Sequence, residues 1–170
     1  MNEQNIISKY VPNFITLLSL SSGFTSIRFS LNGELEIAIY LILLATIFDF
    51  FDGWFARKLK SGSNFGAELD SLSDFVSFGI APSFLIYLWS TYSLNSLGWG
   101  ATLFFVICSA LRLARFTADI YITNKPIDNN EYFVGLPSPA AAGLILLPLF
   151  IYFEFNLKMV DTMVDKRSFI

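Results

Sequence analysis

The sequence contains no histidine, and this absence excludes several kinds of active site. A Ser-His-Asp or Cys-His triad requires an imidazole, and so does a zinc site built on histidine. Any general base is therefore a carboxylate or, less favourably, a lysine or tyrosine. Any metal ion held by side chains must lie among oxygen atoms, which favours Mg²⁺, Mn²⁺ or Ca²⁺.

Cysteine and charged residues are also scarce. The one cysteine, Cys108, lies in an apolar run, which excludes a disulfide framework or a thiolate metal cluster and predicts an inert core residue. Charged residues make up 15% of the 170 residues, whereas a soluble domain carries about 25%. The net charge of −3 leaves no basic stripe for nucleic acid, so we expect no nucleic-acid partner.

Apolar residues, at 54% of the chain, are more abundant than in a soluble protein. They fall into long runs, which predict an all-α integral membrane protein with a bundle of five to six transmembrane helices. No internal repeat divides the chain, so residues 1–170 are expected to form a single membrane domain. The runs expected to span the membrane are 11–29, 35–55, 66–89, 101–116 and 136–155.

Lysine and arginine are distributed unevenly between the turns, and this predicts the orientation. By the positive-inside rule, the N-terminus and the two basic regions lie in the cytoplasm, and membrane lipids surround the rest. Five spans then place the basic C-terminal tail outside, so either a sixth helix is missing at the C-terminus or the count is wrong by one. The basic regions contain Arg57, Lys58 and Lys60, and Arg112, Arg115 and Lys125.

Four carboxylates lie within or beside these apolar runs, between residues 49 and 74. Asp49 and Asp52 are three positions apart, and Asp70 and Asp74 are four apart, so each pair shares one face of a helix. A short polar segment between the pairs predicts a helix, a turn and a returning helix, with both pairs meeting near the turn. Four such carboxylates repel one another and lose hydration unless cations compensate them. We therefore expect two divalent cations here, an arrangement suited to displacement at phosphorus.

The residues around the carboxylates have fixed spacings. The pattern is Asp-x-x-Asp-Gly-x-x-Ala-Arg, then eight residues, then Gly-x-x-x-Asp-x-x-x-Asp. Gly53 and Gly66 allow close approach of a bulky ligand, and Arg57 lies where it can meet a phosphate. This pattern resembles the signature of the CDP-alcohol phosphatidyltransferases, integral-membrane enzymes of phospholipid synthesis.

The resemblance extends over most of the chain. Residues 65–82, 110–116 and 133–143, with the opening at 11–24, are similar to the phosphatidylserine synthase branch of bacteria and archaea. It implies transfer of a phosphatidyl group from CDP-diacylglycerol to L-serine with release of CMP, in a bacterial or archaeal cytoplasmic membrane. It also implies a homodimer and a polar cavity that faces the cytoplasm.

The same resemblance implies roles for individual residues. Two divalent cations, Mg²⁺ or Mn²⁺, would be held on the CDP pyrophosphate, and Asp74 would also take the proton from the serine hydroxyl. The metal ligands would be Asp49, Asp52, Asp70 and Asp74. The nucleotide pocket would be lined by Gly53, Ala56, Arg57 and Gly66, with Asn13 and Thr16 from the first helix.

Three more residues are candidates for binding an anion. Arg112 and Arg115 share a helical face at the end of the fourth span, where they would hold the serine carboxylate or a phosphate. The alternative is that both arginines extend to lipid headgroups and anchor the helix. Ser138, beside two prolines at the start of the fifth span, would contact the substrate or only shape the helix start.

Two other functions compete with serine transfer. The same chemistry could use another acceptor alcohol, such as glycerol 3-phosphate or an inositol phosphate, although a phosphorylated acceptor calls for more positive charge than two arginines provide. A protein of another class, an ion or proton transporter, could use intramembrane aspartates as its relay. The clustering of the aspartates toward one membrane face argues against it, since a transporter site is expected nearer the midplane.

Overall fold

The computed structural model describes the backbone of residues 3–59, 63–123 and 136–167, and the side chains of 10–59, 63–118 and 136–155. The described residues are almost entirely helical, with no strand among them. The elements are α1 (Glu3–Leu31), α2 (Leu35–Leu59), α3 (Asn64–Asp74), η1 (Phe75–Ile80), α4 (Ala81–Trp89), η2 (Thr91–Leu94), α5 (Ser96–Thr123) and α6 (Ser138–Arg167). The all-α prediction is confirmed.

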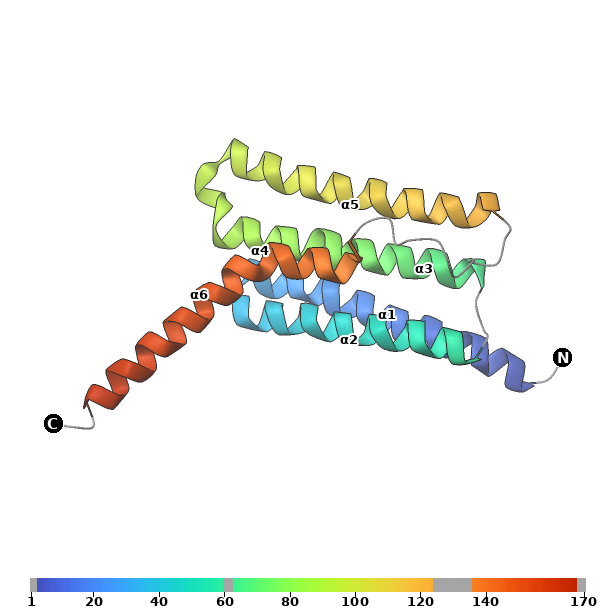
Figure 1. Ribbon diagram of the computed structural model, residues 1–170, viewed down its shortest axis with the longest axis horizontal. Helices are drawn as coiled ribbons and strands as arrows, with labels where there is room; N and C mark the ends of the chain where they lie inside the picture. The colour runs from blue at the N-terminus through green and yellow to red at the C-terminus, as the bar shows by residue number, and fades with distance from the viewer. Residues whose placement is uncertain (1–2, 60–62, 124–135, 168–170) are drawn as a thin grey trace.

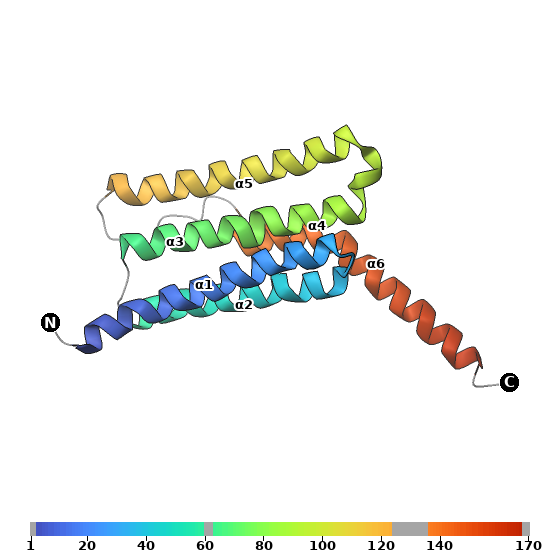
Figure 2. The same cartoon turned by 180° about the vertical axis from the view of Figure 1, so that it is seen from behind.

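The helices run back and forth along one long axis (Figure 1). α1 and α2 form an antiparallel hairpin, closed by Gly33 with a φ of 82°. The continuous α3–η1–α4 segment lies between this hairpin and α5, and the first half of α6 packs against α4 and η1. The second half of α6 diverges from the bundle, as the reverse view also shows (Figure 2).

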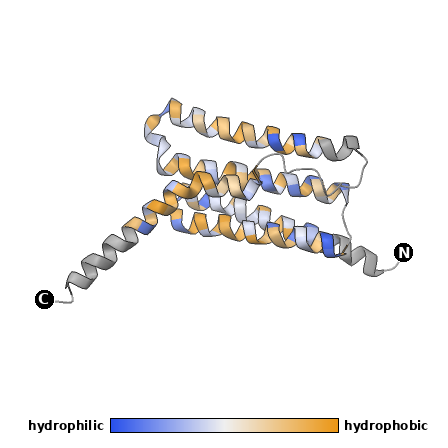
Figure 3. Cartoon of the chain, viewed as in Figure 1, coloured by the Kyte–Doolittle hydropathy of each residue, from blue (hydrophilic) through white to orange (hydrophobic). Residues whose placement is uncertain are grey.

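Four segments of the described chain are long and apolar enough to cross a membrane: 10–31, 64–89, 96–118 and 138–155. α2, which begins with an apolar stretch and ends in the acidic and basic residues, makes the fifth pass of the bundle. Figure 3 shows apolar residues along the length of these helices. The outer face of α5 exposes Leu103, Phe104, Ile107 and Leu111, as expected for a surface in lipid.

α1 joins its neighbours through small polar side chains. The Ser19 and Ser22 hydroxyls donate to the backbone carbonyls of Ala45 and Leu41 on α2, at 2.9 and 2.8 Å. Two further serines, Ser73 and Ser77 of α3 and η1, donate back to carbonyls of α1 at 3.2 Å. In a membrane such bonds contribute only about 0.6 kcal/mol each, but small residues let helix backbones approach closely.

Pro82 lies inside the continuous α3–η1–α4 segment and does not break it. The helix instead widens into the six-residue π-helical segment η1, which begins directly after Asp74. Proline has no N–H to give to the carbonyl four residues back, so the ordinary ladder cannot continue there. The Ser83 hydroxyl lies next to this point and donates to the carbonyls of Gly79 and Ile80 at 2.8 Å.

One end of the bundle gathers most of the charge. The start of α1, the end of α2, the start of α3 and the end of α5 all lie there, in agreement with five antiparallel passes. Arg57 and Lys58 lie in the last turn of α2 at this end. The turns alone predict that basic residues are confined to this end, but Arg28 lies in the last turn of α1 at the opposite end. Lys60, Lys125 and the side chains of the basic C-terminal tail lie outside the described residues.

Candidate active site

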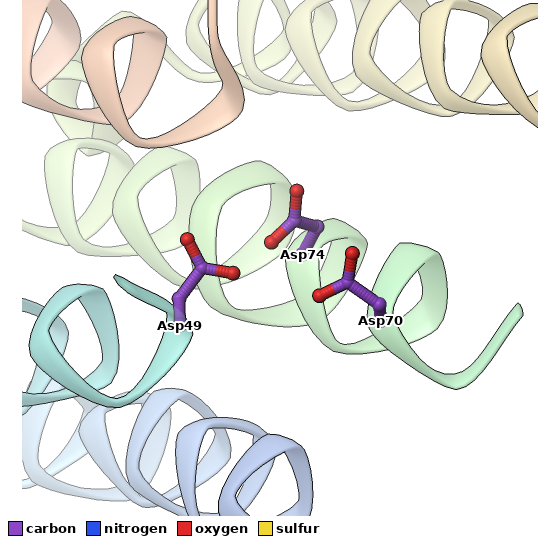
Figure 4. A group of neighbouring side chains, drawn as sticks. All are labelled: Asp49, Asp70 and Asp74. Carbon is purple, nitrogen blue, oxygen red and sulfur yellow. The ribbon is translucent and has the colours of Figure 1, made fainter. Parts of the chain in front are cut away.

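Three of the four predicted carboxylates converge between α2 and α3. Oxygen atoms of Asp49, Asp70 and Asp74 all lie within 4.8 Å of one another. Figure 4 shows Asp49 reaching from α2 toward Asp70 and Asp74, which project from successive turns of α3. The antiparallel course of the two helices and the three- and four-residue spacings produce this meeting, as the sequence predicts.

Asp52 lies beside this group and turns toward α1. Its side chain is only 4% exposed, and it neighbours both Asp49 and the buried Thr16. The Thr16 hydroxyl donates to the Pro12 carbonyl at 3.0 Å. Asp52 Oδ2 is buried and has no hydrogen-bond partner among the residues that the structure describes.

The carboxylates fit divalent cations on two observations. The donors are all oxygen atoms, which Mg²⁺ and Mn²⁺ prefer. Two buried carboxylate oxygens, Asp52 Oδ2 and Asp74 Oδ1, have no partner among the described residues. A buried anion without a partner is strongly unfavourable, so a bound cation would relieve both the repulsion and the lost hydration.

Of the residues predicted to line the nucleotide pocket, Gly53, Ala56 and Arg57 follow Asp52 toward the end of α2, and Gly66 precedes Asp70 near the start of α3. Gly53 has no atom within 4 Å of where a Cβ would stand, so the space above it is open. Gly66 is packed more tightly, since a Cβ there would lie 3.1 Å from Asn13 Oδ1 and 3.2 Å from Ser63 Oγ. Ser63 caps α3 by accepting from the Gly66 N–H at 3.0 Å. Ala56 is half-buried on α2, and Arg57, one residue further, is exposed.

A pocket of about 180 Å³ opens on the other side of Asp74. The polar residues of its wall include Asp74, Arg112 and Ser138, which come from three different helices. Arg112 Nη1 donates to Ser138 Oγ at 3.1 Å, and Ser138 in turn faces the Asp74 carboxylate. Arg112 is half-buried, whereas Arg115 is exposed and is not among the residues lining this pocket. The two predicted arginines therefore occupy different environments.

The apolar wall of this pocket was not predicted from the sequence. Phe78 of η1 and Phe105 and Cys108 of α5 line it. Cys108 is exposed, so the prediction of an inert core residue is wrong. Its position four residues before Arg112 was the available signal, because residues at that spacing share one face of a helix.

Comparison with known proteins agrees with this geometry. Residues 9–165 match the family described as CDP-alcohol phosphatidyltransferase, and the chain belongs to that family. The chain is 43% identical to the CDP-diacylglycerol--serine O-phosphatidyltransferase of Mycobacterium leprae, over 82% of this chain and 47% of the relative. It is 38% identical to the protein of the same name from Helicobacter pylori J99, over 80% of this chain and 55% of the relative.

An archaeal relative is equally similar. The archaetidylserine synthase of Methanothermobacter thermautotrophicus is 39% identical, over 85% of this chain and 60% of the relative. The chain thus spans about half the length of the curated relatives it matches. The family match over residues 9–165 includes the acidic cluster, Gly53 and Gly66, and the pocket with Arg112.

Proposed function

We propose that this protein transfers the phosphatidyl group from CDP-diacylglycerol to L-serine, giving phosphatidylserine and CMP. Family membership supports the donor, and the names of the relatives support the acceptor. The observation that carries the proposal is the pocket in which Asp74, a member of the acidic cluster, lies beside Arg112 and Ser138. A base and an anion-binding group thereby border one small space.

Asp49, Asp52, Asp70 and Asp74 would hold two divalent cations, Mg²⁺ or Mn²⁺. When bound, such cations neutralise the pyrophosphate of the donor and stabilise charge that develops on its oxygen atoms. With cations held by these carboxylates, the donor would lie at the boundary between the acidic cluster and the pocket. The acyl chains of the donor then lie in the bilayer beside the helices.

The nucleotide occupies the open side of the cluster. Gly53 leaves space for the nucleotide, and Arg57 reaches its phosphates from the end of α2. Gly66 and Asn13 would form the opposite wall, since a Cβ on Gly66 would lie 3.1 Å from Asn13 Oδ1. The remaining residues of this nucleotide site are Ala56 and Thr16.

Serine binds in the pocket beyond Asp74, with its carboxylate on Arg112. Asp74 takes the proton of the serine hydroxyl, and the oxygen attacks the phosphorus that carries diacylglycerol. The bond from this phosphorus to the oxygen of CMP breaks, and CMP leaves with the electron pair. In a protein without histidine, a carboxylate bordering both substrates is the available base. Arg115, exposed one turn further along α5, is left to contact a phosphate or lipid headgroup.

The size of the pocket favours a small acceptor. At about 180 Å³ it lies below the roughly 300–1,000 Å³ of a pocket for a drug-sized ligand, and one arginine lines it. An inositol phosphate is bulky and doubly charged, so serine suits the space and the charge better. Glycerol 3-phosphate remains the competing acceptor, and a family of transferases gives an ion transporter no support.

The test is an assay of CMP release from CDP-diacylglycerol by the purified protein in detergent micelles. We expect release to require both a divalent cation and serine, and labelled serine to enter the lipid. Release that is independent of serine, or that responds only to glycerol 3-phosphate, would contradict the proposal. Proteoliposomes without donor lipid should show no proton or cation flux.

The orientation and the oligomeric state belong to the same proposal. The charged end of the bundle, with the N-terminus and the active site, faces the cytoplasm of a bacterial or archaeal cell. Two copies associate as a homodimer, and the exposed apolar side chains on the outer surfaces of the helices would supply its interface. Labelling of single-cysteine variants in intact cells tests the first statement. Light scattering of the detergent-solubilised protein tests the second.

A further inference from the structure

Ser138 lies where three helices meet around the pocket. Asp74 closes α3, Arg112 belongs to α5, and Ser138 is the first residue of α6. All three line the same pocket; Ser138 Oγ accepts a hydrogen bond from Arg112 Nη1 at 3.1 Å, and its hydroxyl faces the Asp74 carboxylate. The serine hydroxyl therefore connects the anion-binding arginine to the proposed base.

The direction of these interactions follows from the chemistry of the groups. A guanidinium only donates, so Ser138 Oγ must accept the hydrogen bond from Arg112 Nη1. The hydroxyl hydrogen of Ser138 is then directed elsewhere. The Asp74 carboxylate faces this hydroxyl and can only accept when ionised. Ser138 thus lies between a donor, Arg112, and an acceptor, Asp74, and its hydroxyl can accept from the first and donate to the second.

The position of Ser138 at the helix start keeps its hydrogen available. Within helices of this protein, hydroxyls commonly donate to the carbonyl four residues earlier, as Thr16, Ser21 and Ser30 do. Ser138 opens α6, so no preceding turn of that helix offers a carbonyl. No backbone carbonyl of the described residues accepts from it. Among the residues that line the pocket, Asp74 offers carboxylate oxygens toward this hydroxyl.

We propose that Ser138 is a positioning residue for Asp74. Anchored by Arg112, its hydroxyl donates to the Asp74 carboxylate and keeps this carboxylate turned toward the acceptor pocket. The inference rests on the proposed function, which makes Asp74 the base. Ser138 acts through Asp74 without itself binding the acceptor. Its loss therefore slows the chemical step and leaves serine binding nearly unchanged.

The variants Ser138→Ala and Ser138→Cys test this role. Alanine has no donor, and cysteine keeps nearly the same size with a weak one, so neither is expected to disturb the fold. We expect kcat to fall about 10- to 100-fold, within the range that positioned proton transfer supplies, in both variants. The KM for serine should change by no more than about threefold, which separates a rate effect from a binding effect. Ser138→Thr, which keeps the hydroxyl, should restore most of kcat.

Readouts other than activity complete the test. Binding of CMP in the presence of Mn²⁺, measured by calorimetry, and the melting temperature should match the wild type in both variants. Ser93→Ala is the matched control, because Ser93 is exposed in η2 and donates only to the nearby Ser90 carbonyl at 3.3 Å. It should leave every quantity unchanged.

The outcomes distinguish the inference from the proposed function. An unchanged kcat in the alanine and cysteine variants, in a protein whose wild type shows serine-dependent release, would overturn the inference alone. A raised KM for serine at constant kcat would also overturn it, by making Ser138 a substrate contact. A wild type without serine-dependent CMP release would overturn the proposed function and the inference with it.

Discussion

Arg112 donates from Nη1 to Ser138 Oγ across 3.1 Å, which joins α5 to the first turn of α6. This bond occupies one of the guanidinium N–H groups at the wall of the pocket. The remaining N–H groups are available for a carboxylate, which a planar fork binds with two parallel hydrogen bonds. Arg112 lines the pocket and Arg115 does not, so we propose Arg112 rather than Arg115 for recognition of the acceptor.

The first prediction concerns the substitution Arg112→Lys. Lysine keeps the charge but loses the fork, so we expect the KM for serine to rise at least about tenfold, which corresponds to about 1.4 kcal/mol. The KM for CDP-diacylglycerol should stay within about twofold of the wild type, because the donor is proposed to bind on the other side of Asp74. Steady-state CMP release at varied serine and varied donor measures both constants.

Arg28→Lys is the control for this substitution. Arg28 is exposed in the last turn of α1, at the end of the bundle far from the pocket. Its replacement should change neither KM. A serine KM that is equal in the Arg112→Lys variant and the wild type would return Arg112 to the role of a headgroup anchor.

The second prediction concerns Asp70→Asn. Asp70 is one of the three carboxylates whose oxygens lie within 4.8 Å of one another, so its neutralisation should weaken the hold on a cation. We expect kcat to fall by about 100-fold or more. Removing one group that stabilises charge in a transition state commonly lowers kcat by this amount. Calorimetry should show weaker Mn²⁺-dependent binding of CMP. The melting temperature should not fall.

Glu68→Gln is the matched control on the same helix. This substitution removes an equal charge from α3, but Glu68 lines a separate groove of about 380 Å³ between α3 and α5. Activity and CMP binding should therefore be retained. If Asp70→Asn kept near-normal activity, the assignment of the acidic cluster to metal ions would be wrong.

Sequence patterns were sufficient for the parts of this protein that depend on local periodicity. Apolar runs located the helices to within a few residues at most ends, and the spacings of Asp49 with Asp52 and of Asp70 with Asp74 set each pair on one helical face. The family resemblance is confirmed by the match over residues 9–165. Its individual site assignments stay predictions, since geometry alone does not test them.

The remaining features depend on contacts between distant residues. Ser138 faces Asp74 although the two residues are 64 positions apart in the sequence, so no local pattern predicts that they meet. Asp52 turns toward Thr16 of α1 because three helices pack there, so the four carboxylates form a group of three with a fourth beside it. The π-helical segment before Pro82 is a response to one missing N–H, which a sequence reveals only as a proline.

The third prediction contrasts two glycines. A Cβ on Gly23 would contact Ser77 Oγ and lie 2.6 Å from Ser77 Cα, so Gly23→Ala forces α1 and η1 apart. Overpacking of this kind costs about 1–3 kcal/mol, and the melting temperature in detergent should fall. Gly53 has open space instead, so Gly53→Ala should melt like the wild type.

The expected effect on the KM for the donor is the opposite of the effect on melting temperature: Gly53→Ala changes this KM, and Gly23→Ala does not. Gly53→Ala places a methyl group where the nucleotide is proposed to lie, so the KM for CDP-diacylglycerol should rise by about tenfold or more, equivalent to at least about 1.4 kcal/mol. Folded Gly23→Ala protein should keep its KM for the donor. A Gly53→Ala variant with an unchanged donor KM would remove Gly53 from the nucleotide site.

The fourth prediction is a crossed effect of Asp49→Asn on thermal stability. Without divalent cations, the three neighbouring carboxylates repel one another, so the variant should melt at a higher temperature than the wild type. With Mn²⁺ and CMP, the wild type should gain stability by mass action, about 2.7 kcal/mol at ligand concentrations 100 times Kd. Asp49→Asn should gain much less.

The two effects have opposite signs, which makes the comparison specific to cation binding. A merely structural role of Asp49 predicts lower melting temperatures for the variant in both conditions. A surface carboxylate predicts no difference in either. Only a cluster whose repulsion is relieved by bound cations raises the melting temperature of the variant in chelator and lowers it, relative to wild type, with Mn²⁺ and CMP. Differential scanning fluorimetry of the wild type and variant, with EDTA and with Mn²⁺ plus CMP, gives the four values. Curves that do not cross would reject the cation site.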